Sequence, residues 1–227
     1  MPVFVGLALF FAFLYPYLVA ETTPAPPELA QDAIRFAERQ DTEPVEVRVE
    51  EWSELTSMPN AYATGLGPSR RIFLWDTLLD GRFSDDEVRV VLAHELAHHS
   101  REHIWKSIAW FALILLPLLG GVAWLTARRG GLYQPRAVPL ALLALVAGSL
   151  ALQPFDNAVS RELEAEADWI ALETTRDPAA ARELFRGFAR EALEDPTPPA
   201  WAYQALATHP SIAERIAMAT AWERRNG

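Results

Sequence analysis

The residues best suited to chemistry in this chain are two histidines four positions apart, in the segment His94-Glu95-Leu96-Ala97-His98. The spacing is H-E-x-x-H. On a helix it places both imidazoles on one face, where they can share one metal ion, with Glu95 beside them and directed towards a water on that ion. The alternative is a surface helix that carries solvated His and Glu side chains. We interpret His94 and His98 as metal ligands in a hydrolytic site.

A catalytic zinc ion takes three protein ligands and keeps one position open. Two more histidines follow the pair, but neither suits the third position. His99 points about 100° away from His98 around a helix, and His103 cannot reach the same ion unless the helix breaks. Arg101 also stands where a return towards the metal would need a glycine turn. We expect His99 and His103 to lie at an interface or to contact the ligands from outside.

The third ligand is expected in the acidic segment 161–168. Glu164 and Asp168 lie one helical turn apart beside an apolar stripe, where an unpaired carboxylate is costly. We therefore predict Glu164 as the ligand and Asp168 as the group that orients a ligand or the motif helix. The alternative is a merely acidic helix face. A solvated face is expected for the remaining acidic residues: Glu162, Glu166 and Glu173.

The histidine pair requires a helix, and the preceding residues give the signals for one. Ser84 and Glu87 form an S-x-x-E capping box, and Asp85 and Asp86 place negative charge at the positive end of the helix dipole. We predict a helix that starts at Ser84, runs towards Trp105 and continues into the apolar segment beyond it. Residue spacing predicts further helices over 28–40, 159–174, 178–193 and 211–225, and short strands over 45–49, 59–65 and 71–75.

Three segments contain no Asp, Glu, Lys or Arg: residues 3–20, 108–126 and 137–155. Each is close to the ~20 residues that cross a bilayer as a helix, and a small domain rarely buries three helices that are apolar on every side. We interpret the second and third as a membrane hairpin with its tip at 127–135. The first is interpreted as an uncleaved anchor, with a signal peptide as the alternative. The lack of ionisable residues inside these segments argues against a small transporter.

Charge and cysteine content exclude several classes of protein and site. The chain has 20 Lys and Arg against 30 Asp and Glu, a net charge of −10, which disfavours nucleic acid as a partner. It contains no cysteine, so disulfides, thiolate zinc sites, iron–sulfur clusters and a cysteine nucleophile are excluded. A metal ion must therefore be held by histidine and carboxylate.

These motifs together resemble the HtpX-like and CAAX-prenyl-protease-like family of membrane zinc endopeptidases, which are gluzincins. H-E-L-A-H, an apolar hairpin and S-R-E-L-E-A-E-A-D occur in the family's order, and the resemblance covers about residues 29–218. One anchor precedes the protease domain here, where HtpX-like members often have two. The resemblance implies these roles: Glu164 and Asp168 as the E-x-x-x-D element, Asn60, Ala61, Tyr62 and Ala63 as the strand that pairs with substrate backbone, His209 as a transition-state hydrogen-bond donor, and Arg215 as a structural partner.

The fold that the resemblance implies is α+β and mainly α-helical: a gluzincin zinc-protease domain with a small sheet and an inserted transmembrane helical hairpin. We expect an N-terminal anchor over 1–20 and a linker over 21–28. The first part of the protease domain, with the sheet and the H-E-x-x-H helix, is expected over 29–103. The hairpin follows over 104–155, and the second part, with the third ligand and the C-terminal helices, over 156–227.

The activity that it implies is that of a membrane-embedded zinc metalloendopeptidase with one Zn²⁺ per chain, acting on membrane or membrane-proximal proteins. Glu95 would be the general base, and His209 would stabilise the oxyanion. The alternative is a catalytically degenerate, zinc-stabilised membrane sensor or scaffold. The arginines of the hairpin tip favour an extracytoplasmic active site on the cell membrane, whereas the HtpX-like relatives argue for a cytoplasmic one.

Overall fold

The computed structural model describes residues 10–18 and 22–227. Within these ranges the protein is mainly α-helical with one small mixed sheet, so the predicted fold class is confirmed. The predicted N-terminal anchor lies largely outside the described residues; its described part is a π-helical turn (Phe10–Leu14) and the short helix α2 (Tyr15–Leu18). The chain divides into two compact units. One runs up to Ile104 and includes 163–197 and 210–227, and the other is formed by 105–162 and 198–209.

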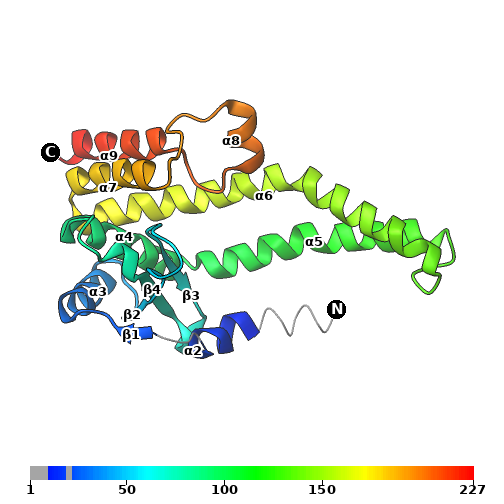
Figure 1. Ribbon diagram of the computed structural model, residues 1–227, viewed down its shortest axis with the longest axis horizontal. Helices are drawn as coiled ribbons and strands as arrows, with labels where there is room; N and C mark the ends of the chain where they lie inside the picture. The colour runs from blue at the N-terminus through cyan, green and yellow to red at the C-terminus, as the bar shows by residue number, and fades with distance from the viewer. Residues whose placement is uncertain (1–9, 19–21) are drawn as a thin grey trace. The chain divides into compact units, whose positions relative to one another are not determined.

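The sheet of the first unit has the strand order β1-β2-β4-β3 (Figure 1). Its strands are β1 (Thr22–Pro24), β2 (Glu46–Glu50), β3 (Ala61–Thr64) and β4 (Arg71–Trp75). β2 and β4 are parallel, whereas β1 and β3 run antiparallel to their neighbours. The Pro-rich segment predicted as an extended linker is extended, and it also pairs with β2, where the Arg48 side chain donates to Thr22 Oγ1 at 2.8 Å. Among the described residues β3 pairs only with β4, so it forms an edge of the sheet.

Helix α4 (Asp85–Ser100) is the centre of the first unit. It contacts α3 (Pro27–Arg39), α7 (Pro178–Glu191), β3 and β4, and α9 (Ile212–Asn226) packs on α7. Leu92 and Leu96 are fully buried on it. Because α4 is covered on most sides, its apolar residues do not form a single stripe. The predicted capping box is present: Ser84 N–H donates to the Glu87 carboxylate at 2.6 Å, and Glu87 N–H donates to Ser84 Oγ at 3.3 Å.

The expectation that this helix continues past Trp105 is wrong. α4 ends at Ser100, and α5 (His103–Ala127) begins after a two-residue turn. Glu102 in this turn has φ 57°, in the left-handed region that interrupts a right-handed helix. The turn is closed by Arg101 N–H donating to the Ala97 carbonyl at 2.9 Å. The helix that carries the histidine pair therefore ends two residues after His98.

The third apolar segment and the acidic segment form one helix, α6 (Val138–Thr175), where a break before residue 159 was expected. Pro154 lies inside this helix without ending it. The acidic segment is thus the direct continuation of an apolar helix.

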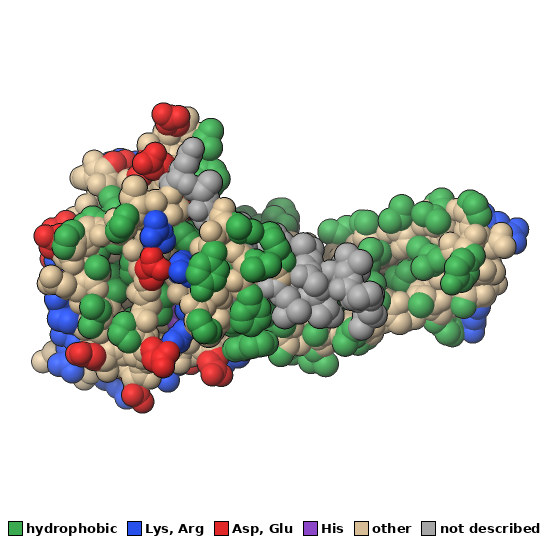
Figure 2. Space-filling model, turned by 90° about the horizontal axis from the view of Figure 1, so that it is seen from below, with side chains coloured by type: hydrophobic (Ala, Val, Ile, Leu, Met, Phe, Trp, Pro, Cys, Tyr) green, Lys and Arg blue, Asp and Glu red, His purple; other side chains and the backbone are tan. Residues whose placement is uncertain are grey.

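The second unit is built from α5, the first part of α6 and the short helix α8 (Ala200–Leu206), which was not predicted. α5 and the helical stretch Pro135–Thr175 are long and apolar enough to cross a membrane, and their most apolar windows are not buried. This exposure is unlike that of the core helix of a water-soluble protein. Figure 2 shows hydrophobic side chains along the two helices and Lys or Arg side chains at their far end. A gap of ≈ 270 Å³ between the helices is lined mainly by apolar side chains, among them Phe111, Leu118 and Leu150.

Candidate metal centre

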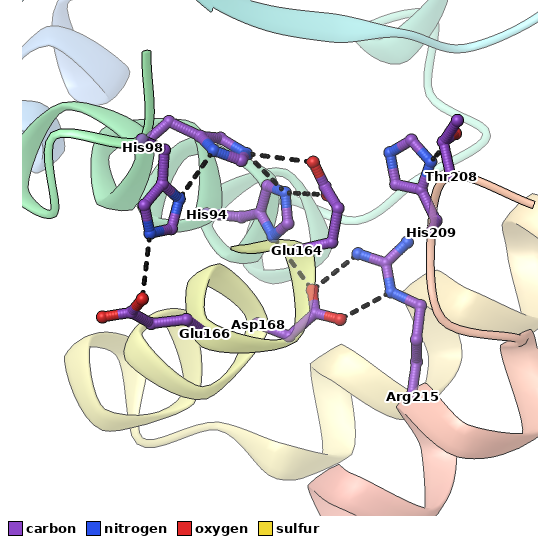
Figure 3. A network of polar contacts seen from close by, with 9 residues as sticks. His94, His98, Glu164, Glu166, Asp168, Thr208, His209 and Arg215 are labelled. Carbon is purple, nitrogen blue, oxygen red and sulfur yellow. Dashed lines mark hydrogen bonds and ion pairs between the residues drawn. The ribbon is translucent and has the colours of Figure 1, made fainter. Parts of the chain in front are cut away.

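Three predicted ligands, His94 and His98 on α4 and Glu164 on α6, point their donor atoms at one another (Figure 3). The two imidazole Nε2 atoms are 3.2 Å apart. Glu164 Oε2 lies 3.2 Å from His94 Nε2, and Glu164 Oε1 lies 3.6 Å from His98 Nε2. The structure thus brings together residues that are 66 positions apart in the chain.

These separations fit a tetrahedral metal ion. A zinc ion bound at roughly 2.0–2.1 Å to each ligand keeps neighbouring donor atoms about 3.3–3.4 Å apart. The distances among His94, His98 and Glu164 lie close to that value. Two nitrogens and one carboxylate oxygen are also a donor set that zinc prefers. The three side chains therefore suit a catalytic zinc ion, with one coordination position left for a reactant.

The electrostatics of the cluster favour a positive charge at the same place. Burial alone would lower the pKa of His94, but the hydrogen bonds and charges of Asp168 and Glu164 raise it to about 10. Burial and the neighbouring charge of His94 lower the pKa of His98 to about 3. Without a metal ion the cluster therefore carries its extra proton on His94. A metal ion on Nε2 would replace that proton.

Asp168, one helical turn after Glu164, lies behind His94. Its Oδ1 is 2.9 Å from His94 Nδ1, and the carboxylate accepts two hydrogen bonds from Arg215, at 2.6 and 2.7 Å. Because a carboxylate only accepts, His94 Nδ1 carries a hydrogen, and Nε2 is the ring nitrogen that faces the other donors. The Arg215 guanidinium also stacks over the Phe185 ring at 4.2 Å. Arg215 of α9 and Asp168 of α6 thus orient a residue of α4.

His99 and His103 do not contribute donor atoms to the cluster of three. His99 is buried and donates from Nε2 to the Arg71 carbonyl at 3.2 Å, which ties α4 to β4. Burial lowers the pKa of His99 to about 4, so its ring is neutral. His103 lies behind His98, with the two Nδ1 atoms 3.0 Å apart, and its Nε2 is 3.2 Å from Glu166 Oε2. Glu166, on the face predicted to be solvated, is 42% exposed and also contacts His103.

Glu95 points from α4 towards the edge strand β3. Burial raises the pKa of its carboxyl to about 7, against the opposing effects of His94 and of a hydrogen bond from the Ala63 backbone. That hydrogen bond places the carboxylate against β3, whose predicted substrate-pairing residues include Ala61, Tyr62 and Ala63. Tyr62 stacks on Phe73 and donates from its hydroxyl to Glu50 at 3.0 Å, which fixes the ring on the sheet. Asn60, just before the strand, accepts from Ala61 N–H at 2.9 Å.

His209 belongs to the second compact unit, in the loop that follows α8. Its ring is exposed, and its Nδ1 lies 3.0 Å from the Thr208 hydroxyl. Within this unit Arg161 of α6 donates to the carbonyls of Ala207, at 2.7 Å, and Tyr203, and Asn157 donates to Ala205 at 2.7 Å. These donors bind carbonyls at and just beyond the carboxyl end of α8. Arg161 and Asn157 therefore hold the start of the His209 loop.

A sequence model of peptidase family M48 matches residues 27–223. The chain belongs to peptidase family M48. The predicted family resemblance is thereby confirmed, and membership implies a metal ion at the His and Glu cluster.

Several proteins named as metalloproteases or proteases have sequences similar to that of this chain. The chain is 35% identical over 174 residues to an uncharacterized metalloprotease YhfN of Bacillus subtilis (72% of this chain, 41% of that protein). It is 29% identical over 161 residues to a protease HtpX homolog of Methylibium petroleiphilum (70% and 55%). It is 26% identical over 224 residues to a CAAX prenyl protease 1 homolog of Oryza sativa (93% and 52%). The chain thus spans about half the length of these relatives.

The fold is that of a solved relative. The crystal structure of S. mikatae Ste24p superposes with a TM-score of 0.77 at 22% sequence identity, over 96% of this chain and 56% of that one. At this identity the likeness establishes the common fold alone.

Two structural features around the site were missed by sequence reasoning. The first is the turn that brings His103 against His98, because its left-handed residue is Glu102 and the segment contains no Gly or Pro. The second is the hydrogen bond from Arg161 to the Ala207 carbonyl, which joins residues more than 40 positions apart. The spacing of His98 and His103 was a possible signal for the turn. Residues five positions apart do not meet on a continuous helix, but they can meet where the helix breaks.

Proposed function

We propose that this protein is a membrane zinc metalloendopeptidase that cleaves membrane or membrane-proximal proteins. His94, His98 and Glu164 hold one Zn²⁺ per chain. The observation that carries the proposal is the 3.2–3.6 Å spacing of their donor atoms, the spacing of three ligands on one tetrahedral ion, in a chain of peptidase family M48.

The proposed mechanism assigns one task to each residue. Bound zinc supplies the Lewis acidity that lowers the pKa of a water and polarises the scissile carbonyl. Glu95 accepts the proton of the attacking water and delivers it to the leaving amine. In the metal-free site, burial raises the pKa of this carboxyl to about 7. His209 donates a hydrogen bond to the oxyanion that develops on the substrate carbonyl. Asp168 and Arg215 keep His94 in its ligand tautomer.

Substrate is proposed to bind as an added strand along β3. The open edge of β3 offers backbone N–H and C=O groups to an extended peptide. Residues Asn60 to Ala63 form this edge and the turn into it. Since the Ala63 backbone also contacts Glu95, a peptide on this edge would lie close to the general base.

The two apolar helices are proposed to anchor the protein in the cell membrane with the active site outside. Arg128 and Arg129 lie in the tip of the hairpin and Arg136 directly follows it, and no acidic residue lies between them. Positively charged loops remain in the cytoplasm, so the tip is assigned to that side. Because the chain contains no cysteine, single Cys variants at Tyr133 in the tip and Leu55 in the protease unit can be labelled without background. An impermeant maleimide added to intact cells should label Leu55→Cys but not Tyr133→Cys; the reverse result overturns the assignment.

The activity is tested with the full chain purified in detergent and reconstituted in vesicles. Cleavage of casein and of a model membrane protein is measured before and after chelation and after Zn²⁺ is restored. Glu95→Gln should abolish cleavage and still bind Zn²⁺, whereas Glu183→Gln, an exposed carboxylate on α7, should behave as the wild type. Cleavage by chelated protein or by Glu95→Gln contradicts the mechanism. Zinc binding without any cleavage by the wild type would favour the sensor or scaffold instead.

A further inference from the structure

The break between α4 and α5 brings His103 against a metal ligand. In an unbroken helix, residues five positions apart project about 140° apart. Here the turn at Arg101 and Glu102 places His103 Nδ1 3.0 Å from His98 Nδ1. The left-handed conformation of Glu102 is costly for a residue with a Cβ, and such conformations concentrate at functional sites. The turn thus has a consequence at the candidate metal centre.

The hydrogen-bond partners define where the protons lie. Glu166 is a carboxylate, so it accepts from His103 Nε2–H at 3.2 Å. When His98 binds a metal ion through Nε2, its Nδ1 carries the ring hydrogen and donates it to the lone pair of His103 Nδ1. This tautomer leaves the lone pair of His98 Nε2 facing His94 and Glu164 (Figure 3).

The two histidine ligands are supported differently. His94 donates directly to the buried carboxylate of Asp168, which is only 3% exposed. His98 reaches its carboxylate through a second imidazole, His103, which is 2% exposed, and Glu166 at the end of the series is 42% exposed. The first arrangement is sealed in the core, and the second leads to the protein surface.

We propose that His103 and Glu166 are positioning residues that hold His98 in the tautomer and orientation needed to bind the metal ion. The inference rests on the metal site of the proposed function. It assigns a role to two residues outside the ligand set. In other proteins, mutation of the partner that holds a ligating histidine lowers metal affinity or activity about 10–100-fold.

The test measures metal binding in place of turnover. The metal-free full chain in detergent is titrated with Zn²⁺ against a competing chelator, and with Co²⁺, whose visible absorption reports the ligand geometry. His103→Leu removes both hydrogen bonds, His103→Gln retains an acceptor for His98, and Glu166→Gln removes the terminal charge. Glu173→Gln is the matched control, because it removes a carboxylate from α6 two turns further along, where Glu173 accepts only from Trp169 among the described hydrogen bonds.

His103→Leu should weaken Zn²⁺ binding about 10–100-fold and alter the Co²⁺ spectrum. Glu166→Gln should weaken it by a smaller factor, His103→Gln should restore much of the loss, and Glu173→Gln should match the wild type. Unchanged affinity and spectrum in both His103→Leu and Glu166→Gln overturn the inference and leave the proposed function standing. A wild type that binds neither metal overturns the proposed function and the inference with it.

A folding defect is recognised separately. His103 is buried, so the unfolding midpoint of each variant is measured in the metal-free state. Glu166 is half-exposed, and its replacement by Gln leaves the packing unchanged. If His103→Leu fails to fold, Glu166→Gln decides the question alone: weakened zinc binding supports the inference, and wild-type binding overturns it.

Discussion

The Asp168 carboxylate lies 2.9 Å from the imidazole of His94 and accepts two hydrogen bonds from Arg215. One buried side chain on α6 thereby joins α4 to α9. The charge of Arg215 is compensated where water does not reach it, and the orientation of His94 depends on that compensation. Stability and metal binding are therefore coupled at this residue.

Asp168→Asn should be destabilising and should weaken the metal site. It leaves the Arg215 guanidinium buried without its counter-ion, which costs about 3–5 kcal/mol in comparable pairs. It should also lower Zn²⁺ affinity about 10–100-fold, because the acceptor of the His94 Nδ1–H loses its negative charge. Thermal unfolding and zinc titration measure the two effects. Glu223→Gln, which breaks the more exposed ion pair with Arg182, should change stability by less than about 1 kcal/mol; an equal loss in both variants would refute the coupling.

His99 should make the metal-free protein sensitive to acid. Burial lowers its pKa to about 4 in the folded state, against 6.5 for the free side chain. Between these two pH values the folded state binds fewer protons than the unfolded chain. The contribution of His99 to the free energy of unfolding is therefore fully present above pH 6.5 and is lost as the pH drops towards 4. The expected loss is up to about 3 kcal/mol. His99→Gln, which can still donate to the Arg71 carbonyl, should flatten this part of the stability curve measured by denaturant titration with chelator present. Parallel curves for the two proteins would contradict the assignment.

Gly65→Ala should disrupt the turn after the edge strand β3. Gly65 has φ +86°, and an added Cβ would lie 2.1 Å from the Ser69 carbonyl oxygen. Strain and overlap together should cost about 3 kcal/mol. Gly81 has φ +92° with open space around it, so Gly81→Ala is a control for the backbone conformation alone and should cost about 1 kcal/mol. The difference between their melting temperatures isolates the overlap, and equal shifts would disprove it.

Arg161→Leu should impair turnover without affecting zinc affinity. The variant removes the hydrogen bonds from Arg161 to the carbonyls of Ala207 and Tyr203 and loosens the loop that carries His209. Small displacements of a catalytic group cost up to about 100-fold in rate, so a fall in kcat of about 10–100-fold is expected. Peptide cleavage kinetics and zinc titration are compared in the same preparation. Glu162→Gln, at the neighbouring exposed residue, is the control and should retain the wild-type kcat. A loss of zinc affinity in Arg161→Leu would mean that the substitution acts on the metal ligands and would contradict this prediction.

Local signals predicted much of the secondary structure. The capping box at Ser84 starts α4 where it was expected, because the hydrogen bonds that define it join residues only three apart. The alternation of valines predicted β2, and helical spacing predicted α3, α7 and α9. The turn at Glu102 was missed because its left-handed residue is not glycine, and the continuous helix α6 was missed because its apolar and acidic segments were predicted as separate elements.

The sequence by itself determined which atoms can bind a metal in this protein. Without cysteine, only histidine and carboxylate remain, and the i, i+4 spacing places two imidazoles on one helical face whatever surrounds the helix. The choice of Glu164 also follows from local spacing, since an unpaired carboxylate beside an apolar stripe needs a partner.

Only the tertiary structure decided how these atoms are held. The tautomers of His94 and His98 depend on hydrogen bonds to Asp168 and His103, and the contact with His103 depends on the turn after Ser100. The raised pKa of Glu95 requires burial against β3, a strand that lies more than 30 positions before Glu95 in the sequence. Spacing along a helix fixes which side chains share a face, but burial, charge and proton position arise from segments that meet only in the folded chain.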